Sequence, residues 1–249
     1  MIATTGLGRS FDGRWAVRNL SLAIGKGELY GFLGQNGAGK TTTLRLLTGL
    51  LRPSEGTLRI AGMDHRADGA RLRQVVGFVP DTPPLYDYLT GRQHTALVAS
   101  LWNVDRRTRD ERAERFFDVL GLRDAIDEPC KAASHGTRKK IHLAAVLTTA
   151  PQVLLLDEPT TGLDPMSTRR LKDLLLEECA RGTTVMLSTH VLEIAEQVCD
   201  RVGILAHGRL RAQGTVAELR QRFGDGSLED VFVRTMEKAE STDDGPAAR

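Results

Sequence analysis

Residues 34–42 read GQNGAGKTT, with three glycines and an alanine crowded in front of one lysine. Glycine inside a regular element costs roughly 0.5–1 kcal/mol relative to alanine, so such a cluster marks backbone that must approach another group closely. The apolar segment GELYGFLG (27–34) precedes it, and TTTLRLLTGLL (41–51) follows with helical spacing up to Pro53. The pattern predicts a strand, a loop and a helix in succession.

The same stretch fits the phosphate-loop pattern G-x-x-x-x-G-K-[ST] at Gly34, Gly39, Lys40 and Thr41. In that pattern, backbone N–H groups and a helix N-terminus surround a polyphosphate, the lysine reaches the outer phosphates, and the hydroxyl binds Mg²⁺. The predicted strand and helix on either side are the context that the pattern requires, which argues against a chance match. A dinucleotide-binding turn is disfavoured, because the glycines lie at 34, 37 and 39 and Lys40 follows directly.

A pair of acids ends the apolar run VLLLDEP (153–159). An unbroken apolar run predicts a strand that is buried on both faces. Carboxylates at its end are costly unless they meet a cation, and Mg²⁺ bound to phosphates supplies one. We therefore expect Asp157 to hold the metal and Glu158 to act on water. A strand that simply ends in solvated acids is the alternative.

The remaining sequence alternates short strand candidates with helical segments. Strands are expected at 56–62, 75–80 and 183–189, with a hairpin over 203–214. Residues 90–150 have helical periodicity and no convincing strand. Further helices are expected over 165–182, 191–202, 215–223 and 227–239, followed by a disordered tail.

Composition narrows the classes of partner. The chain has 249 residues, 41% hydrophobic and 27% charged, and 34 basic against 32 acidic side chains give a net charge of +2. This balance argues against a polycationic nucleic-acid-binding protein, so no nucleic-acid partner is expected. No apolar run approaches the ~18 residues that a membrane helix needs. If the protein serves a membrane, we expect other chains to cross it.

Five motifs in a fixed order make the chain similar to a known family. They are GQNGAGKTT (34–42), ASHGT (133–137), LLLDEP (154–159), GLD (162–164) and STH (188–190). Over about residues 1–235 the sequence resembles the nucleotide-binding domain of ABC transporters. The resemblance implies an α/β fold with a P-loop NTPase (RecA-like) core, an antiparallel portion around 2–30 and 56–62, and an inserted helical subdomain near 86–150. Residues 236–249 are expected to form a disordered tail.

The resemblance also implies roles for individual residues. Phe11 would stack on the adenine of ATP, Asp157 and Thr41 would hold Mg²⁺, Glu158 would polarise the attacking water, and His190 would contact the γ-phosphate. Asp164 lies in the loop that crosses the dimer interface in this family. Ser134, His135 and Gly136 occupy the signature motif, which closes over ATP bound to the opposite protomer. The phosphates themselves would be held by Gly34, Gln35, Asn36, Gly37, Ala38, Gly39, Lys40, Thr41 and Thr42.

Two positions depart from the family pattern. The common signature Leu-Ser-Gly-Gly-Gln is replaced by Ala133-Ser134-His135-Gly136-Thr137, which adds a ring near the expected γ-phosphate of the partner's ATP. At the Q-loop position, after the strand candidate at 75–80, the family glutamine is replaced by Asp81. An anion there would either coordinate Mg²⁺ or repel the γ-phosphate. Both changes bear on the efficiency of hydrolysis more than on ATP binding.

The signature segment can also be interpreted without the resemblance. Ser134 precedes an amphipathic run and is expected to cap a helix, whose N-terminus attracts phosphate; an ordinary capping serine is the alternative. The next cations, Arg138, Lys139 and Lys140, are expected to form a solvated helix face.

Taken with the resemblance, these features imply an ATPase that works as a homodimer or an ATP-induced dimer. It would drive a separate integral-membrane permease from the cytoplasmic face of the membrane. The stretches VPDTPPLYDYLTGRQH (79–94) and SLEDVF (227–232) resemble stand-alone exporter ATPases of the ABC-2 type. The alternatives are a soluble ABC-type ATPase that acts in macromolecular assembly and a small-molecule kinase. The kinase would leave the signature and Ser-Thr-His stretches unexplained.

Overall fold

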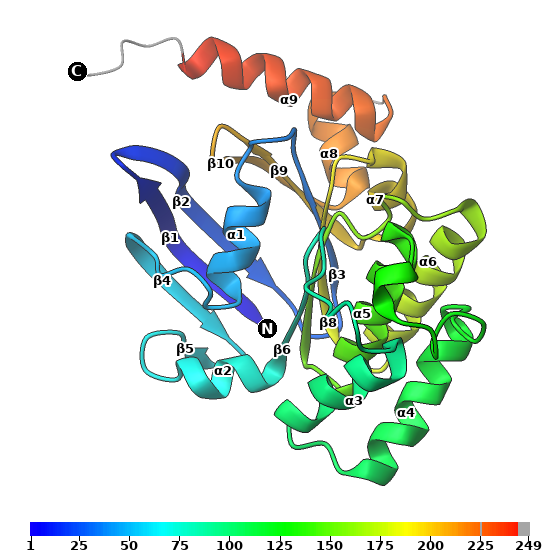
Figure 1. Cartoon of the computed structure of the whole chain (residues 1–249). Helices are drawn as coiled ribbons and strands as arrows, with labels where there is room; N and C mark the ends of the chain where they lie inside the picture. Colours follow the sequence, from blue (N-terminus) through cyan, green and yellow to red (C-terminus); the bar gives the residue numbers. More distant parts are fainter. Residues whose placement is uncertain (225, 244–249) are drawn as a thin grey trace.

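The computed structural model describes residues 1–224 and 226–243, and the strands of these residues form two sheets (Figure 1). The first sheet is antiparallel, with strand order β2-β1-β4-β5. Its strands are β1 (Ile2–Phe11), β2 (Arg14–Ile24), β4 (Glu55–Ile60) and β5 (Met63–Asp64). The expected antiparallel portion around residues 2–30 and 56–62 is therefore confirmed.

The second sheet has six strands in the order β10-β9-β3-β8-β7-β6, parallel except for the β9–β10 hairpin. Every residue of β3 and β7 is buried, as their unbroken apolar sequences predict. Each of these strands also has a neighbouring strand at both of its edges, so both lie inside the sheet. The strands are β3 (Leu29–Leu33), β6 (Val76–Val79), β7 (Val153–Asp157), β8 (Thr184–Thr189), β9 (Arg201–Ala206) and β10 (Arg209–Gly214).

Helix α1 (Lys40–Leu47) lies between the two sheets, as Figure 1 shows. Its buried leucines pack with side chains of β1, β2 and β4 on one side and of β3 and β7 on the other. The helix was expected to reach residue 51 but ends at Leu47, because Gly49 takes a left-handed conformation (φ +73°). Helix α2 (Gly69–Val75) leads into β6. The phosphate-loop helix is thus held on both sides by the core.

Residues 90–150 are helical, as expected, apart from a single β-bridge between Thr90 and Pro129. The helix over 135–148 packs on the parallel sheet at β6, and the helices over 91–101 and 106–119 pack on that helix. Side chains of the helices over 106–119 and 135–148 share an apolar core with α6 (Pro165–Ala180). The segment consists of α3 (Gly91–Leu101), α4 (Arg106–Val119), a short 3₁₀ turn η1 (Cys130–Ala132) and α5 (His135–Thr148).

The C-terminal part contains α7 (Leu192–Val198), α8 (Val216–Phe223) and α9 (Leu228–Asp243). The helix expected over 191–202 ends at Val198, because the chain continues into β9 at Arg201. The disordered tail expected over 236–249 is wrong at its start, since α9 runs to Asp243 with Thr235 and Ala239 buried. Residues 244–249 lie outside the described part. In that part no helix is both long and apolar enough to cross a membrane.

Two buried histidines lie in contact between α3 and α5. Because they are buried, we expect the free energy of unfolding to decrease in acid. His94 Nε2 lies 3.2 Å from His142 Nδ1, and burial lowers the pKa of His142 from 6.5 to about 4. Between pH 6.5 and pH 4, His142 is therefore protonated in the unfolded chain but neutral in the folded chain. The free energy of unfolding consequently falls as the pH drops through this range. For this one group we expect the free energy of unfolding to fall by about 2 kcal/mol between pH 7 and pH 5. Urea unfolding at both pH values checks this. His142→Asn should reduce the difference, and an unchanged difference would contradict the assignment.

Candidate nucleotide site

Three motifs that lie far apart in the sequence meet at one edge of the parallel sheet. Strands β3, β8 and β7 are neighbours, and their registers pair Leu33 with Thr189 and Asp157 with Ser188. The phosphate loop follows β3, the acid pair ends β7, and the Ser-Thr-His stretch ends β8. The phosphate loop and the acid pair, together with Ala16 and Asp81, form a pocket of about 270 Å³. It is lined by Ala16, Gln35, Asn36, Gly37, Gly39, Lys40, Thr41, Thr42, Asp81, Asp157 and Glu158.

Glycine is required at three positions of the phosphate loop, and the physical reason differs from one position to the next. A Cβ on Gly34 would lie 2.7 Å from the Leu205 carbonyl oxygen, and one on Gly39 would lie 2.4 Å from that of Ala16. Gly37 faces open space, with φ +81°. Gly34 is therefore required by the packing of the loop on β9. Gly39 is required both by its packing on β2 and by its positive φ of +107°, and Gly37 by its backbone conformation alone. The sequence alone had attributed all three to the approach of phosphate.

Lys40 is the first residue of α1, and its side chain is buried against the phosphate loop. Its Nζ donates to the carbonyl oxygens of Gly34 (2.6 Å) and Gln35 (3.3 Å) and lies 3.3 Å from Glu158 Oε1. Gly39, which precedes α1, provides no side-chain cap for the first turn of that helix. The N–H groups of this turn and the Lys40 ammonium therefore both make the electrostatic potential in the pocket positive.

The residues expected at the metal are in contact. Thr41 Oγ1 donates to Asp157 Oδ2 at 2.7 Å, and Ser188 Oγ donates to Asp157 Oδ1 at 2.5 Å. Hydroxyl and carboxylate oxygens are the ligands that Mg²⁺ prefers, and it commonly uses one carboxylate together with substrate phosphates. This set of donors fits Mg²⁺. The described residues contain no group of three or more His, Cys, Asp and Glu side chains that could bind a metal alone. Sequence reasoning missed Ser188, although it lies in the Ser-Thr-His stretch.

Glu158 is oriented by an unusual backbone conformation. It has φ +47°, and its N–H donates to the carbonyl of Ser188 at 3.0 Å. Its Oε2 lies 2.9 Å from His190 Nδ1, while Oε1 faces Lys40 without a hydrogen-bond partner in the described part of the chain. The structure therefore brings Glu158 and His190 together. The Oε1 oxygen thus keeps an unused acceptor position, buried beside the Lys40 ammonium.

Other expected residues lie outside the pocket lining. Phe11 ends β1 with 41% of its surface exposed, and the Arg9 guanidinium lies 4.7 Å from its ring centroid. Ser134 is exposed and caps α5, accepting from the Thr137 N–H at 3.2 Å, which confirms the predicted N-cap. His135 is exposed beside it, and Gly136 is buried. Asp164 caps α6, and hydrogen bonds from Ser167 lower the pKa of its carboxyl group.

The solvated face expected for Arg138, Lys139 and Lys140 is wrong for its central residue. Lys139 is only 3% exposed, and its Nζ lies 2.7 Å from Asp81 Oδ1. Arg138 also has a carboxylate partner, Asp87, at 2.9 Å. A lysine that is buried so completely must be paired, and no periodicity in the sequence identifies a partner 58 residues away.

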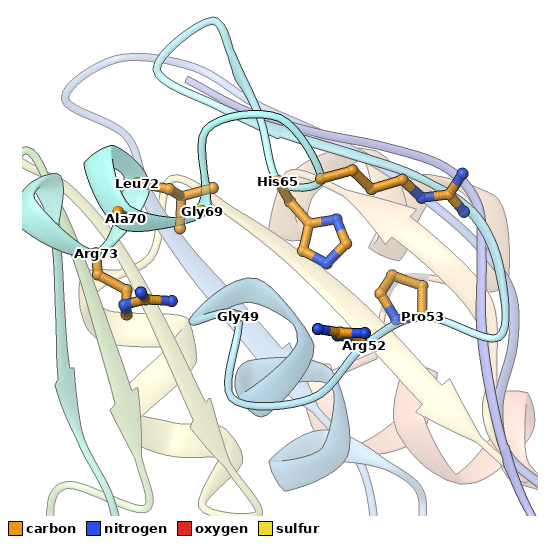
Figure 2. A pocket seen from close by; sticks show the side chains of 9 residues that line it. Gly49, Arg52, Pro53, His65, Gly69, Ala70, Leu72 and Arg73 are labelled. Carbon is orange, nitrogen blue, oxygen red and sulfur yellow. The ribbon is translucent and has the colours of Figure 1, made fainter.

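A larger cavity of about 560 Å³ lies elsewhere, between the loop after α1 and helix α2. Figure 2 shows Arg52 and His65 on one side of it and Arg73 on the other, with Gly49 between them. None of the residues that line this cavity belongs to the five motifs. The volume of a cavity therefore does not identify the nucleotide site in this protein, because the motif residues line the smaller pocket.

Comparison with known proteins agrees with this geometry. The family described as "ABC transporter" matches residues 17–161. The daunorubicin/doxorubicin resistance ATP-binding protein DrrA of Streptomyces peucetius is 38% identical over 240 residues, which cover 96% of this chain and 73% of DrrA.

Solved structures give the same result. The structure titled as the ATP binding subunit of an ABC transporter superposes with a TM-score of 0.90 at 28% identity, covering 94% of this chain and 99% of that one. The bacterial ABC transporter cassette MJ0796, described as dimeric, has a TM-score of 0.76 at 25% identity, covering 86% and 98%. The kinase and the soluble assembly ATPase do not fit these relatives. The chain belongs to the ABC transporter family, in which it is an ATP-binding and ATP-hydrolysing subunit.

Proposed function

We propose that this subunit hydrolyses Mg²⁺-ATP as a dimer that drives export through a separate integral-membrane permease. The observation that carries the proposal is the convergence of the phosphate loop, the Thr41–Asp157 pair and Glu158 on one pocket. The subunit would act on the cytoplasmic face of the membrane, held there by the permease.

Mg²⁺ would be held by Thr41 and Asp157 and would neutralise charge on the phosphates. Lys40 and the loop N–H groups would bind the β- and γ-phosphates, with Phe11 against the adenine. Glu158 would orient and deprotonate the attacking water, while His190, hydrogen-bonded to Glu158 Oε2, would contact the γ-phosphate. Catalysis by this chain then rests on position and charge, as in other phosphoryl transfers.

A dimer is supported by the position of the signature residues. Ser134 and His135 are exposed at the N-terminus of α5 and absent from the lining of the pocket in their own chain. We propose that they cover ATP bound to a second copy, with Asp164 at the interface between the two. MJ0796, a similar cassette, is dimeric in its structure.

Export is supported by a relative, DrrA, whose name describes resistance to daunorubicin and doxorubicin. The permease would contact the segment that follows the Asp81 position. Two aromatic rings protrude there, Tyr86 with 63% and Tyr88 with 85% of their surface exposed. The backbone beneath is fixed, because the N–H groups of Cys130 and Lys131 donate to the carbonyls of Leu89 and Asp87. Exposed aromatic rings on a rigid backbone are typical of binding hot spots.

Tyr88→Ala should therefore weaken capture of the permease by about 30-fold, as the loss of an aromatic hot spot does, and should leave ATP binding intact. The measurement is a pull-down from detergent-solubilised membranes of the source cells, read by mass spectrometry for a polytopic protein, together with an export assay. Tyr86→Ala and Leu89→Ala should act in the same direction. Val233→Ala, which shortens an exposed side chain on α9, is the matched control. Undiminished association and export in all three variants would locate the interface elsewhere.

A further inference from the structure

The buried lysine of α5 has all of its hydrogen-bonding capacity used. Lys139 Nζ donates to Asp81 Oδ1 at 2.7 Å, to the Glu158 carbonyl oxygen at 2.7 Å and to the Thr161 carbonyl oxygen at 3.1 Å. An ammonium group has three N–H donors, and each finds one acceptor here. The arrangement is a complete set of bonds around a buried cation.

These three acceptors belong to two segments. Asp81 follows β6, whereas Glu158 and Thr161 lie in the loop that leads from β7 to Asp164, and Asp81 and Glu158 line the nucleotide pocket. Helix α5 is docked tightly on this last loop, since a Cβ on Gly136 would lie 2.3 Å from the Gly162 carbonyl oxygen. Lys139 therefore connects the signature helix to the residues that line the phosphate site.

The bond to Glu158 bears on catalysis directly. Glu158 has a left-handed backbone conformation that is rare for a residue with a side chain, so its peptide groups must be held by their partners. The N–H donates to the Ser188 carbonyl, and the Glu158 carbonyl accepts from Lys139 Nζ at 2.7 Å and from the Thr161 N–H at 3.3 Å, so Lys139 is its closer and its charged partner. With both ends fixed, the carboxylate is aimed at Lys40 and His190.

The bond to Asp81 has an electrostatic consequence. Asp81 lines the nucleotide pocket, so an unpaired charge on it would repel the phosphates of ATP. The cation of Lys139 lies against this carboxylate and balances its charge. In turn, Asp81 supplies the counter-charge that a buried ammonium requires.

We infer that Lys139 is a positioning residue for ATP hydrolysis, which holds the Glu158 backbone and cancels the charge of Asp81 in the pocket. The inference rests on the proposed role of Glu158. It makes Asp81 and Lys139 a functional pair that replaces the neutral glutamine common in this family.

Lys139→Met tests it, because methionine preserves much of the length and removes the ammonium. We expect kcat for ATP hydrolysis to fall by about 30-fold, since the carbonyl of Glu158 and the carboxylate of Asp81 both lose their charged partner. The KM for ATP should rise by a smaller factor, about threefold, because the unpaired Asp81 carboxylate repels the phosphates while the phosphate loop that binds them is untouched. Lys140→Met, one residue along the same helix, is the matched control: its Nζ lies 3.4 Å from the Ser167 hydroxyl and has no ion pair within the residues that the structure describes, so kcat should stay close to that of the unmodified protein.

The pairing itself is tested by a double-mutant cycle on kcat. In an Asp81→Asn background no carboxylate is left unpaired, so Lys139→Met should reduce kcat by only about threefold. Equal fold losses in the two backgrounds would overturn the pairing, and a Lys139→Met protein with unchanged kcat would overturn the positioning role.

If Lys139→Met does not fold, as judged by circular dichroism, Asp81→Lys replaces it. Asp81 is half exposed, and a second cation there should displace Lys139 and lower kcat by at least about tenfold. Unchanged kcat in that variant would also overturn the inference.

Comparing Lys139→Met with Glu158→Gln distinguishes a failure of the Lys139 inference from a failure of the proposed function. If Glu158→Gln is inactive and Lys139→Met is normal, only the positioning role is wrong. If Glu158→Gln is active, the proposed role of Glu158 is wrong whatever Lys139 does.

Discussion

Glu158→Gln is expected to lower kcat for ATP hydrolysis by about 10²-fold or more, as the loss of a general base does. The amide keeps the size of the side chain and can still accept from His190, but it cannot take a proton from water. Its backbone requirement is unchanged, because glutamine and glutamate pay the same penalty at φ +47°. Steady-state phosphate release at saturating Mg²⁺-ATP measures the effect. Glu193→Gln is the matched control, because Glu193 is an exposed acid on α7 whose carboxylate accepts a hydrogen bond from Gln197.

The same variant should accumulate the ATP-bound dimer. If Ser134 covers the nucleotide of a second protomer, unhydrolysed ATP should hold two copies together, and size-exclusion chromatography should show a dimer with Mg²⁺-ATP but not with ADP. Adding Ser134→Arg should remove this dimer by steric bulk while Lys40 still binds ATP. Normal hydrolysis by Glu158→Gln would refute its catalytic role. An inactive variant that stays monomeric in ATP would refute a shared site formed by two copies of this chain alone.

Lys40→Ala is expected to weaken Mg²⁺-ATP binding by about 10²-fold, because charge-assisted bonds from a buried ammonium to phosphate are among the strongest in proteins. Lys40 is 6% exposed, and alanine has no group that could replace its contacts. Isothermal titration with Mg²⁺-ATP measures the change.

The control for this variant is Lys172→Ala, which removes a lysine of α6 that bonds Gln197 on α7 and does not line the nucleotide pocket. It should bind ATP as the unmodified protein does. Equal affinity in Lys40→Ala and the unmodified protein would reject the phosphate-loop assignment. Circular dichroism excludes unfolding as the cause of a loss.

Much of the site could be predicted because its signals are local. The phosphate loop is a contiguous pattern, β7 is a contiguous apolar run, and the Ser134 cap depends on residues one turn away. Backbone conformation and burial periodicity over such short windows are set by the residues themselves. The same kind of evidence correctly predicted the helical segment 90–150 and the hairpin at 203–214.

Local signals failed where a distant contact decided the outcome. The periodicity predicted a helix over 227–239 and the resemblance a disordered tail from 236, yet α9 continues to Asp243, with Ala239 buried against the rest of the molecule. The run Arg138-Lys139-Lys140 has the composition of a solvated face, yet burial of Lys139 is favourable because three oxygens from other segments surround it.

By itself, the sequence determined that this protein binds polyphosphate and carries an acid pair at the end of a buried strand, since each depends on neighbouring residues. Only the tertiary structure decided which charges are balanced. Lys40 faces Glu158, Ser188 bonds Asp157, and Lys139 cancels Asp81 across a sequence separation of 58 residues. The physical reason is that charge interactions depend on distance and burial in space, and these are fixed only when strands β3, β8, β7 and β6 are ordered side by side in the sheet.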